Sequence, residues 1–159
     1  MTEAGGEKSS PEISMEFHLP AELSALRDIR RHIVELAREY QVGEEHIAKI
    51  EISVDEACAN VMQHAYGPEQ KFNTMRAGAL IVIVRILADR VEIEVIDQGV
   101  GELNGSHQGV SDLVEYVNLA SHSGLGLYII AKCMDDYQVA FPDRAGTHLS
   151  MMKYVDRPA

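Results

Sequence analysis

The chain has 159 residues, enough for one domain with a substantial core. Hydrophobic residues make up 46% and charged residues 25%, which is typical of a globular protein and excludes a disordered or fibrous chain. Fourteen lysines and arginines against twenty-five aspartates and glutamates give a formal charge of −11, which disfavours direct nucleic-acid and anionic-membrane partners. Because no apolar run is long enough to span a membrane and no secretory signal opens the chain, we expect a cytoplasmic protein.

The composition along the chain predicts one folded domain between two tails. Residues 1–12 are rich in Gly, Ser, Glu and Lys without periodicity, so we expect a flexible N-terminal tail. The domain then covers residues 13–155, and a short C-terminal tail covers 156–159. Cys58 and Cys133 lie in apolar helical surroundings and are expected to be reduced core residues.

Two hydrophobic periodicities alternate along the domain, one of two residues for strands and one of three to four for helices. In chain order they predict a strand at 13–19, helices at 20–40 and 44–66, strands at 79–87 and 90–97, a helix at 125–134, and strands at 137–141 and 147–155. The glycine-rich stretch 98–123 is irregular apart from a short helical candidate near 111–119, and long irregular stretches in compact domains are usually functional or disordered. The pattern predicts an α+β fold, a two-layer α/β sandwich with helices packed on one face of a mixed, mostly antiparallel sheet.

A polar row follows one face of the helix predicted at 44–66. Glu56, Asn60 and His64 are spaced four residues apart, so they share a face beside the apolar stripe. The row is either a solvated helix face or a ligand site, and His64 is either part of that site or a cap for its helix. An amide oxygen suits Mg²⁺, and a carboxylate one turn earlier is able to accept a proton.

Asp97 ends the strand predicted at 90–97 on the same face as its buried valines and isoleucine. Because a buried carboxylate needs a hydrogen-bond donor, Asp97 either caps its own turn or binds an amino-bearing ring. Gly99 and Gly101 follow and would allow a ligand to approach the backbone closely.

A glycine-rich turn opens the helix predicted at 125–134. Gly124, Leu125, Gly126 and Leu127 present free backbone amides and a positive helix end, which suit a phosphate, although a plain helix entry is an equal alternative. The spacing matches neither the dinucleotide-binding fingerprint nor the P-loop. Gly146-Thr147 at the start of the last strand is a weak signal alone.

Taken together, these segments resemble the ATP site of the gyrase, histidine-kinase and MutL superfamily, the Bergerat fold. Glu56-Ala-Cys-Ala-Asn60 resembles its N box, Asp97-x-Gly99-x-Gly101 and Gly124-x-Gly126-Leu127 its two glycine boxes, and Gly146-Thr147 its closing pair. Within the superfamily, the phrases around Asn60 and after Gly124 resemble the anti-sigma-factor serine/threonine kinases. The resemblance covers about residues 13–155.

The resemblance implies roles for individual residues. Asn60 would coordinate Mg²⁺ on ATP, Asp97 would accept from the adenine amino group with support from Thr147, and Glu56 would be the general base. Residues 102–123 would form a mobile lid over ATP. The implied nucleotide-binding residues are Asn60, Asp97, Gly99, Gly101, Gly124, Leu125, Gly126, Leu127 and Thr147.

The implied function is that of an ATP-dependent protein serine/threonine kinase that acts as an anti-sigma factor. It would phosphorylate a serine of an antagonist protein and sequester a sigma factor, and by analogy it would form a homodimer through its first strand and helix. Some relatives carry an arginine just before the second glycine box, where this chain has His122-Ser123. That departure favours the alternative, a nucleotide-gated partner-binding regulator with weak or no kinase activity.

Overall fold

The computed structural model describes residues 11–20, 23–66, 80–97, 125–140 and 147–158, without the side chains of residues 23, 62–66 and 125. Its elements in chain order are β1 (Ile13–Leu19), α1 (Leu23–Glu39), α2 (Glu44–Tyr66), β2 (Leu80–Ile86), β3 (Arg90–Asp97), α4 (Leu125–Cys133), β4 (Asp136–Ala140) and β5 (His148–Tyr154). None of the helices in these ranges has the length and apolar character needed to cross a membrane.

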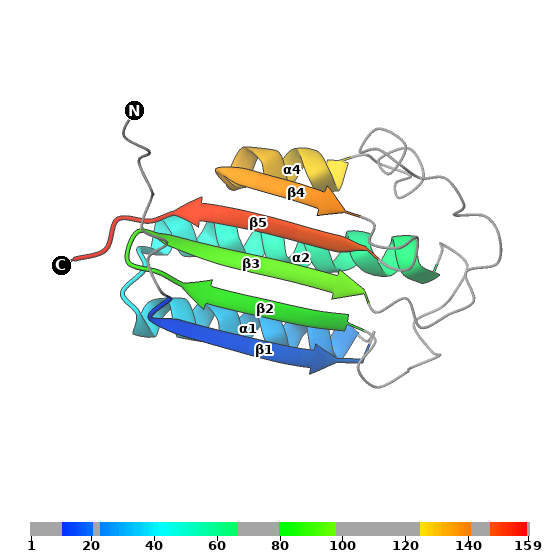
Figure 1. Ribbon diagram of the computed structural model, residues 1–159, viewed down its shortest axis with the longest axis horizontal. Helices are drawn as coiled ribbons and strands as arrows, with labels where there is room; N and C mark the ends of the chain where they lie inside the picture. The colour runs from blue at the N-terminus through cyan, green and yellow to red at the C-terminus, as the bar shows by residue number, and fades with distance from the viewer. Residues whose placement is uncertain (1–10, 21–22, 67–79, 98–124, 141–146, 159) are drawn as a thin grey trace, which may run out of the picture.

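The five strands form one sheet in the order β1-β2-β3-β5-β4 (Figure 1). All four strand pairs within it are antiparallel, so the parallel pairing allowed for by a mixed sheet is absent from the described strands. The reason lies in the connections. α1 and α2 together carry the chain back and forth once between β1 and β2, so β2 starts at the end where β1 finishes and runs the opposite way.

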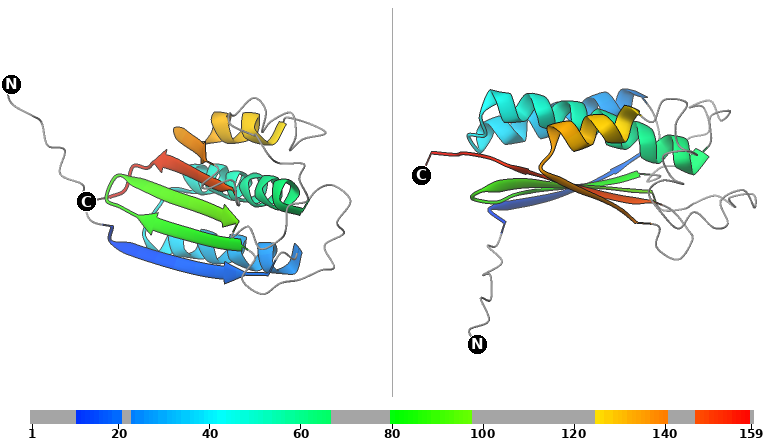
Figure 2. Two further views of the ribbon diagram at one scale, coloured as in Figure 1. Left: turned by 45° about the vertical axis from the view of Figure 1, so that its right-hand side comes forward. Right: turned by 90° about the horizontal axis from the view of Figure 1, so that it is seen from above.

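All three described helices cover the same face of the sheet, which gives the two-layer α+β sandwich predicted from the sequence (Figure 2). The helical periodicity of α1 and α2 places Ile29, Ile33, Ile50 and Val54 against the sheet, each at most 2% exposed. In β2 and β3 every second residue is buried on the helix side, as the alternation predicts. The other face of the sheet has no helix on it in the described part of the chain.

The predicted elements agree closely with the structure. The first strand, the second helix and the strand at 90–97 have the predicted bounds, the last helix begins at residue 125 as predicted, and the other ends differ by one to three residues. The helical candidate near 111–119 lies outside the described residues. Both cysteines are free, but only Cys58 is buried, while Cys133 is half-buried. Burial, and then the nearby charge of Asp55, raise the pKa of the Cys58 thiol to about 12.

A single arginine near the end of the chain joins three segments at one end of the molecule. Arg157 donates from Nε to the carbonyl of Tyr40, from Nη1 to the carbonyl of Leu87, and from Nη2 to the carboxylate of Glu12, at 2.7, 2.8 and 2.7 Å. Its guanidinium also lies 5.9 Å from the centre of the Tyr40 ring. Arg157 therefore connects the ends of α1 and β2 and the start of β1.

Candidate active site

The second half of α2 carries the predicted acid and amide. Asn60 is only 8% exposed, while Glu56, one helical turn earlier, is half-buried. Between them Ala57 and Cys58 are fully buried and fix this part of the helix on the sheet. The solvated-face interpretation of this row is therefore wrong for Asn60, whose side chain is turned into the molecule.

The Asn60 amide is the unusual group of the site. Its Nδ2 atom is buried and has no hydrogen-bond partner among the described residues. An unpaired buried amide costs about 1–3 kcal/mol, and native proteins keep few such groups. A buried polar group left without a protein partner is typical of a place where a ligand, ion or water completes the hydrogen bonding.

Gly126 lies against both polar residues of α2. A Cβ atom added at this glycine would lie 2.7 Å from Nδ2 and 2.9 Å from Oδ1 of Asn60, and 3.0 Å from Oε2 of Glu56. These separations are shorter than real Cβ contacts, so only glycine fits here without moving the acid or the amide. The structure therefore brings together the row of Glu56 and Asn60 on α2 and the first turn of α4, two parts of the site predicted separately from the sequence.

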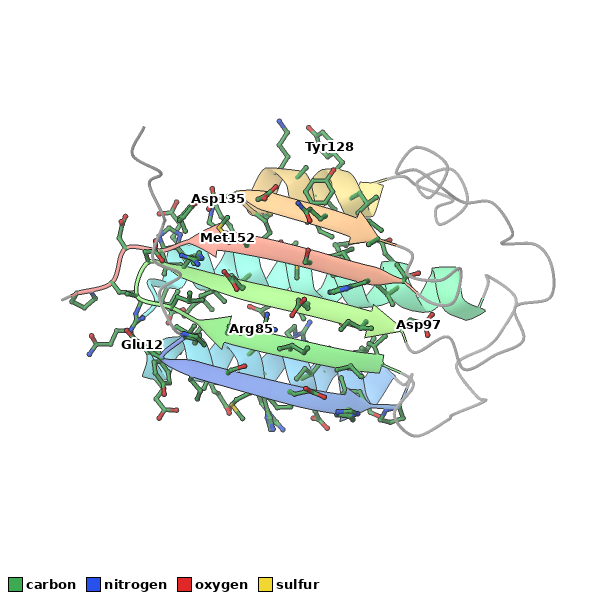
Figure 3. All side chains as sticks on the ribbon, viewed as in Figure 1. Glu12, Arg85, Asp97, Tyr128, Asp135 and Met152 are labelled. Carbon is green, nitrogen blue, oxygen red and sulfur yellow. The ribbon has the colours of Figure 1, made fainter. Side chains whose placement is uncertain are left out.

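Asp97 and Thr147 form the second part of the site. Asp97 is 4% exposed, on the helix side of β3 as its position in the alternation predicts, and Thr147 is fully buried just before β5. The Asp97 backbone amide donates to the Thr147 carbonyl at 2.9 Å. Figure 3 shows Asp97 at the end of β3 toward which α2 also runs, so both parts of the site lie at one end of the molecule.

An arginine of α1 neutralises acids beside the site, and sequence reasoning missed it. Arg30 donates from Nη1 to Asp55 Oδ2 at 2.7 Å, and its Nε lies 3.6 Å from Glu51 Oε1. The hydrogen bond to Asp55, with the attraction of that carboxylate, raises the pKa of Arg30. The signal in the sequence was an arginine on one amphipathic helix and two acids one turn apart on the next, but periodicity alone does not show which residues face each other.

Comparison with known protein families matches most of the folded chain to a single domain family. The family model of the histidine kinase-like ATPase domain matches residues 19–153. This range runs from the last residue of β1 into β5 and includes all of the predicted site residues. The chain belongs to the histidine kinase-like ATPase family. Membership in an ATPase family implies that the chain binds ATP.

Within the histidine kinase-like ATPases, the curated relatives of this chain include serine-protein kinases. The chain is 31% identical over 146 residues to serine-protein kinase RsbW of Bacillus cereus strain Q1, covering 90% of this chain and 86% of the relative. It is 30% identical, with the same coverage, to RsbW of Bacillus thuringiensis subsp. konkukian. At this identity and coverage the chain belongs with the RsbW serine-protein kinases, the anti-sigma-factor kinase branch that the motifs resemble.

A solved structure supports the fold. The RsbU and RsbW domains of Rv1364c from Mycobacterium tuberculosis match with a TM-score of 0.64 at 19% identity. The match covers 94% of this chain but only 34% of that longer chain. At this identity the likeness shows the architecture and not the activity.

The remaining predicted site residues of this ATPase-family chain either lie outside the described residues or pack in the hydrophobic core. Gly99, Gly101, Gly124, the lid at 102–123 and His122 are outside, and so are the side chains of His64 and Leu125. Leu127 is 6% exposed and packs in the hydrophobic core. Lys132, in the last turn of α4, lies 5.4 Å over the ring of the exposed Tyr128.

Proposed function

We propose that the protein is an ATP-dependent protein serine/threonine kinase of the anti-sigma-factor type. It would transfer the γ-phosphoryl group of ATP to a serine of an antagonist protein, and it would also bind a sigma factor. The observation that carries this proposal is the contact of Gly126 with both Glu56 and Asn60. A proton acceptor, an oxygen ligand and a helix N-terminus suited to phosphate meet there, which is the set of groups that phosphoryl transfer needs.

The residues present fit Mg²⁺-ATP. The buried Asn60 amide nitrogen has no partner among the described residues and is able to donate to a phosphate oxygen, and Gly126 leaves the space that a Cβ would fill. Mg²⁺ prefers oxygen ligands and usually takes only one or two from the protein, the rest from substrate phosphates and water. Asn60 Oδ1 would therefore hold the ion, which would supply positive charge to a triphosphate on a chain whose formal charge is −11.

The buried Asp97 would accept from the exocyclic amino group of adenine, with Thr147 beside it. A carboxylate that is 4% exposed discriminates strongly, because a base with a carbonyl oxygen at that place would set two hydrogen-bond acceptors against each other. This pairing would select adenine over guanine. The first turn of α4, with Leu125 and Gly126, would direct backbone amides at the phosphates.

Glu56 would act as the general base. In the proposed step the serine hydroxyl of the antagonist gives its proton to Glu56 as its oxygen bonds to the γ-phosphorus. The bond from that phosphorus to the bridging oxygen breaks, and ADP leaves with the electron pair. Because Arg30 pairs with Asp55, the acid next to Glu56 in sequence, less negative charge surrounds the base than the sequence suggests.

The proposal is tested by phosphoserine formation on candidate antagonist proteins incubated with Mg-ATP and the full chain. We expect Glu56→Gln to lower the transfer rate by about 100-fold or more, in the range lost with a general base, while ATP affinity changes little. The matched control is Glu45→Gln in the first turn of the same helix, three turns before Glu56, where the side chain is 83% exposed. Equal rates for wild type and Glu56→Gln would contradict the catalytic role.

A nucleotide-gated regulator without phosphoryl transfer is the second candidate, favoured by His122 in place of an arginine. Tight Mg-ATP binding together with the absence of phosphoserine on every antagonist that binds the protein would favour this candidate over the kinase. Binding of a sigma factor would persist in both cases, because an acidic surface suits a basic sigma segment.

A further inference from the structure

The outward side of α2 carries a row of residues that we call the outer strip: Ala48, Ile52, Asp55 and Ala59. Their spacing of four, three and four residues puts them on one face of the helix. Ala48 and Ile52 are exposed, and Asp55 and Ala59 are half-buried. Among the described residues of α2, Ile52 is the large apolar side chain that remains exposed, at 47%. The strip is therefore less polar than the solvated face of an ordinary amphipathic helix.

The charged groups beside the outer strip are paired within the protein. Arg30 of α1 donates to Asp55 at 2.7 Å, and its Nε lies 3.6 Å from Glu51. On α2 itself, Lys49 Nζ lies 3.7 Å from Glu45 Oε1. Because these acids already have basic partners, a strongly basic segment gains little by binding here. The strip suits an uncharged, apolar segment better, since charged groups are depleted from the centres of protein interfaces.

The outer strip borders the candidate general base. Ile52 precedes Glu56 by four residues, which is about 6 Å along the helix axis. α2 lies between α1 and α4 in the helix layer (Figure 2). Glu56 is on the side of α2 that approaches Gly126 of α4, and Asp55 pairs with Arg30 on the side of α1. Ile52 therefore belongs to the exposed surface immediately beside Glu56.

The position of Glu56 limits which partner covers the outer strip. A serine hydroxyl that gives its proton to Glu56 must come within about 2.6–3.2 Å of the carboxylate. A stable protein contact covers about 800 Å² on each partner, which is a disc about 16 Å in radius. Ile52, one helical turn from Glu56, falls inside such an area. The protein that carries the acceptor serine is therefore the partner that must lie against this surface.

We propose that Ile52 and the outer strip bind the antagonist protein beside its acceptor serine, through an apolar side chain of the antagonist. Ile52 selects the protein whose serine reaches the site, and Glu56 takes the proton. The inference rests on the proposed function and adds the surface that recognises the substrate. A sigma factor is a less suitable occupant, because a basic sigma segment would find the nearby acids already paired.

The test separates antagonist binding from chemistry in the full chain. The probe is the candidate antagonist protein that the wild type binds most tightly in Mg-ADP, which has no γ-phosphoryl group to transfer. Phosphoserine formation is then measured in Mg-ATP over a range of antagonist concentrations. Ile52→Ala removes apolar contact area and should raise KM for the antagonist by about tenfold, and Ile52→Glu should raise it further. The value of kcat should stay within about twofold of the wild type, because a contact made equally in the ground and transition states changes only KM.

Tyr154→Ala and Tyr154→Glu are the matched controls. Tyr154 is 55% exposed and ends β5, at the opposite end of that strand from Thr147. Both variants should keep the wild-type KM and kcat, and circular dichroism should show all four variants folded. An unchanged KM in Ile52→Glu, or a fall in kcat without a rise in KM, would overturn the docking role. Loss of sigma-factor binding in Ile52→Glu with antagonist binding intact would also overturn it, because the sigma factor would then occupy the strip.

Failure of the kinase proposal gives a different result. If the wild type binds an antagonist without forming phosphoserine, the same variants are compared by antagonist affinity in Mg-ADP. Binding weakened about tenfold in Ile52→Ala, with Tyr154→Ala unchanged, would support the strip and contradict only phosphoryl transfer. Equal affinities would overturn the strip, and a wild type that binds no antagonist would overturn both proposals.

Discussion

Arg157 and Asn60 each bring polar nitrogen atoms into the interior at opposite ends of the molecule, and their surroundings differ. Figure 3 labels Glu12, a partner of Arg157, at one end and Asp97, near the candidate site, at the other. Each of the three guanidinium nitrogens of Arg157 donates to a protein oxygen. The Asn60 Nδ2 atom has no partner in the part of the chain that the structure describes.

The comparison indicates how stability and function divide between the two ends. Satisfied buried hydrogen bonds stabilise the fold, and removing one partner leaves the other exposed to the full cost of desolvation. An unsatisfied buried group weakens the fold but is available to a ligand. Changes at the Arg157 end should therefore reduce stability and leave nucleotide binding intact. Changes at the Asn60 end should weaken nucleotide binding without reducing stability.

The largest effect is expected for Gly126→Ala. The added methyl group would push Asn60 and Glu56 out of place, because its carbon would lie 2.7 to 3.0 Å from their polar atoms. Displacement of about 1 Å in such a site costs about 100-fold in rate, so phosphoryl transfer should fall by at least that factor, with weaker Mg-ATP binding. Gly43→Ala is the control, because its Cβ would meet only His46, at 3.7 Å. Similar transfer rates for both variants would contradict the site.

Arg157→Ala should lower the free energy of unfolding by about 2 kcal/mol in urea denaturation, because two carbonyls and a carboxylate lose their donor. Arg31→Ala should change it by less than about 0.5 kcal/mol, since Arg31 and its partner Asp28 are 65% and 66% exposed. Affinity for Mg-ATP should stay at the wild-type value in both. A loss of Mg-ATP affinity in Arg157→Ala would contradict the assignment of stability to one end of the molecule and nucleotide binding to the other.

Asn60→Leu should change the free energy of unfolding in the opposite direction to Arg157→Ala. It removes a buried amide that lacks a partner and keeps a similar volume, so the free energy of unfolding should rise by about 1 kcal/mol. Mg-ATP affinity should fall sharply in an equilibrium binding measurement. Lower stability of Asn60→Leu would show that the amide is satisfied in solution and would remove the contrast with Arg157.

The smallest effect is expected at Glu94, a satisfied charge between the two ends that lies 2.6 Å from Arg85 and 2.8 Å from His148. Burial acts to raise the pKa of Glu94, but the hydrogen bonds from Arg85 and His148 outweigh it and hold the pKa below its ordinary value. Its contribution to stability is therefore fully present above the unfolded value of about 4.3 and is lost as the pH falls through the folded value. Glu94→Gln should lower the free energy of unfolding by less than about 1 kcal/mol at pH 7.

The difference between wild type and Glu94→Gln should shrink below about pH 4 in denaturation at a fixed protein concentration. Glu45→Gln, at an 83% exposed position, should show a smaller difference at pH 7. A difference for Glu94→Gln that grows as the pH falls would contradict the direction of the shift.

The fold was largely predictable from hydrophobic periodicity. The strict alternation of residues 90–97 predicted both the strand and the burial of Asp97, and the structure agrees. Strand direction was less well predicted, because periodicity describes which face of a strand is buried and not which strand lies beside it. Counting the two helices between β1 and β2 would have predicted their antiparallel pairing.

The site was predictable where its residues are close in sequence. The four-residue spacing of Glu56 and Asn60 put them on one face of α2, as observed. Their contact with Gly126, the ion pair of Arg30 with Asp55, and the missing partner of Asn60 were not predictable. Each depends on how α2 lies against another helix, and that packing is decided by side chains far apart in the chain.

Arg157 also has a consequence for how the protein folds during synthesis. Its partners are 70, 117 and 145 residues earlier in the chain. On the ribosome, β1, α1 and the β2 end therefore emerge long before the group that joins them. These three contacts form only after residue 157 has emerged, so released chains truncated before residue 157 should be more sensitive to protease than chains that include it.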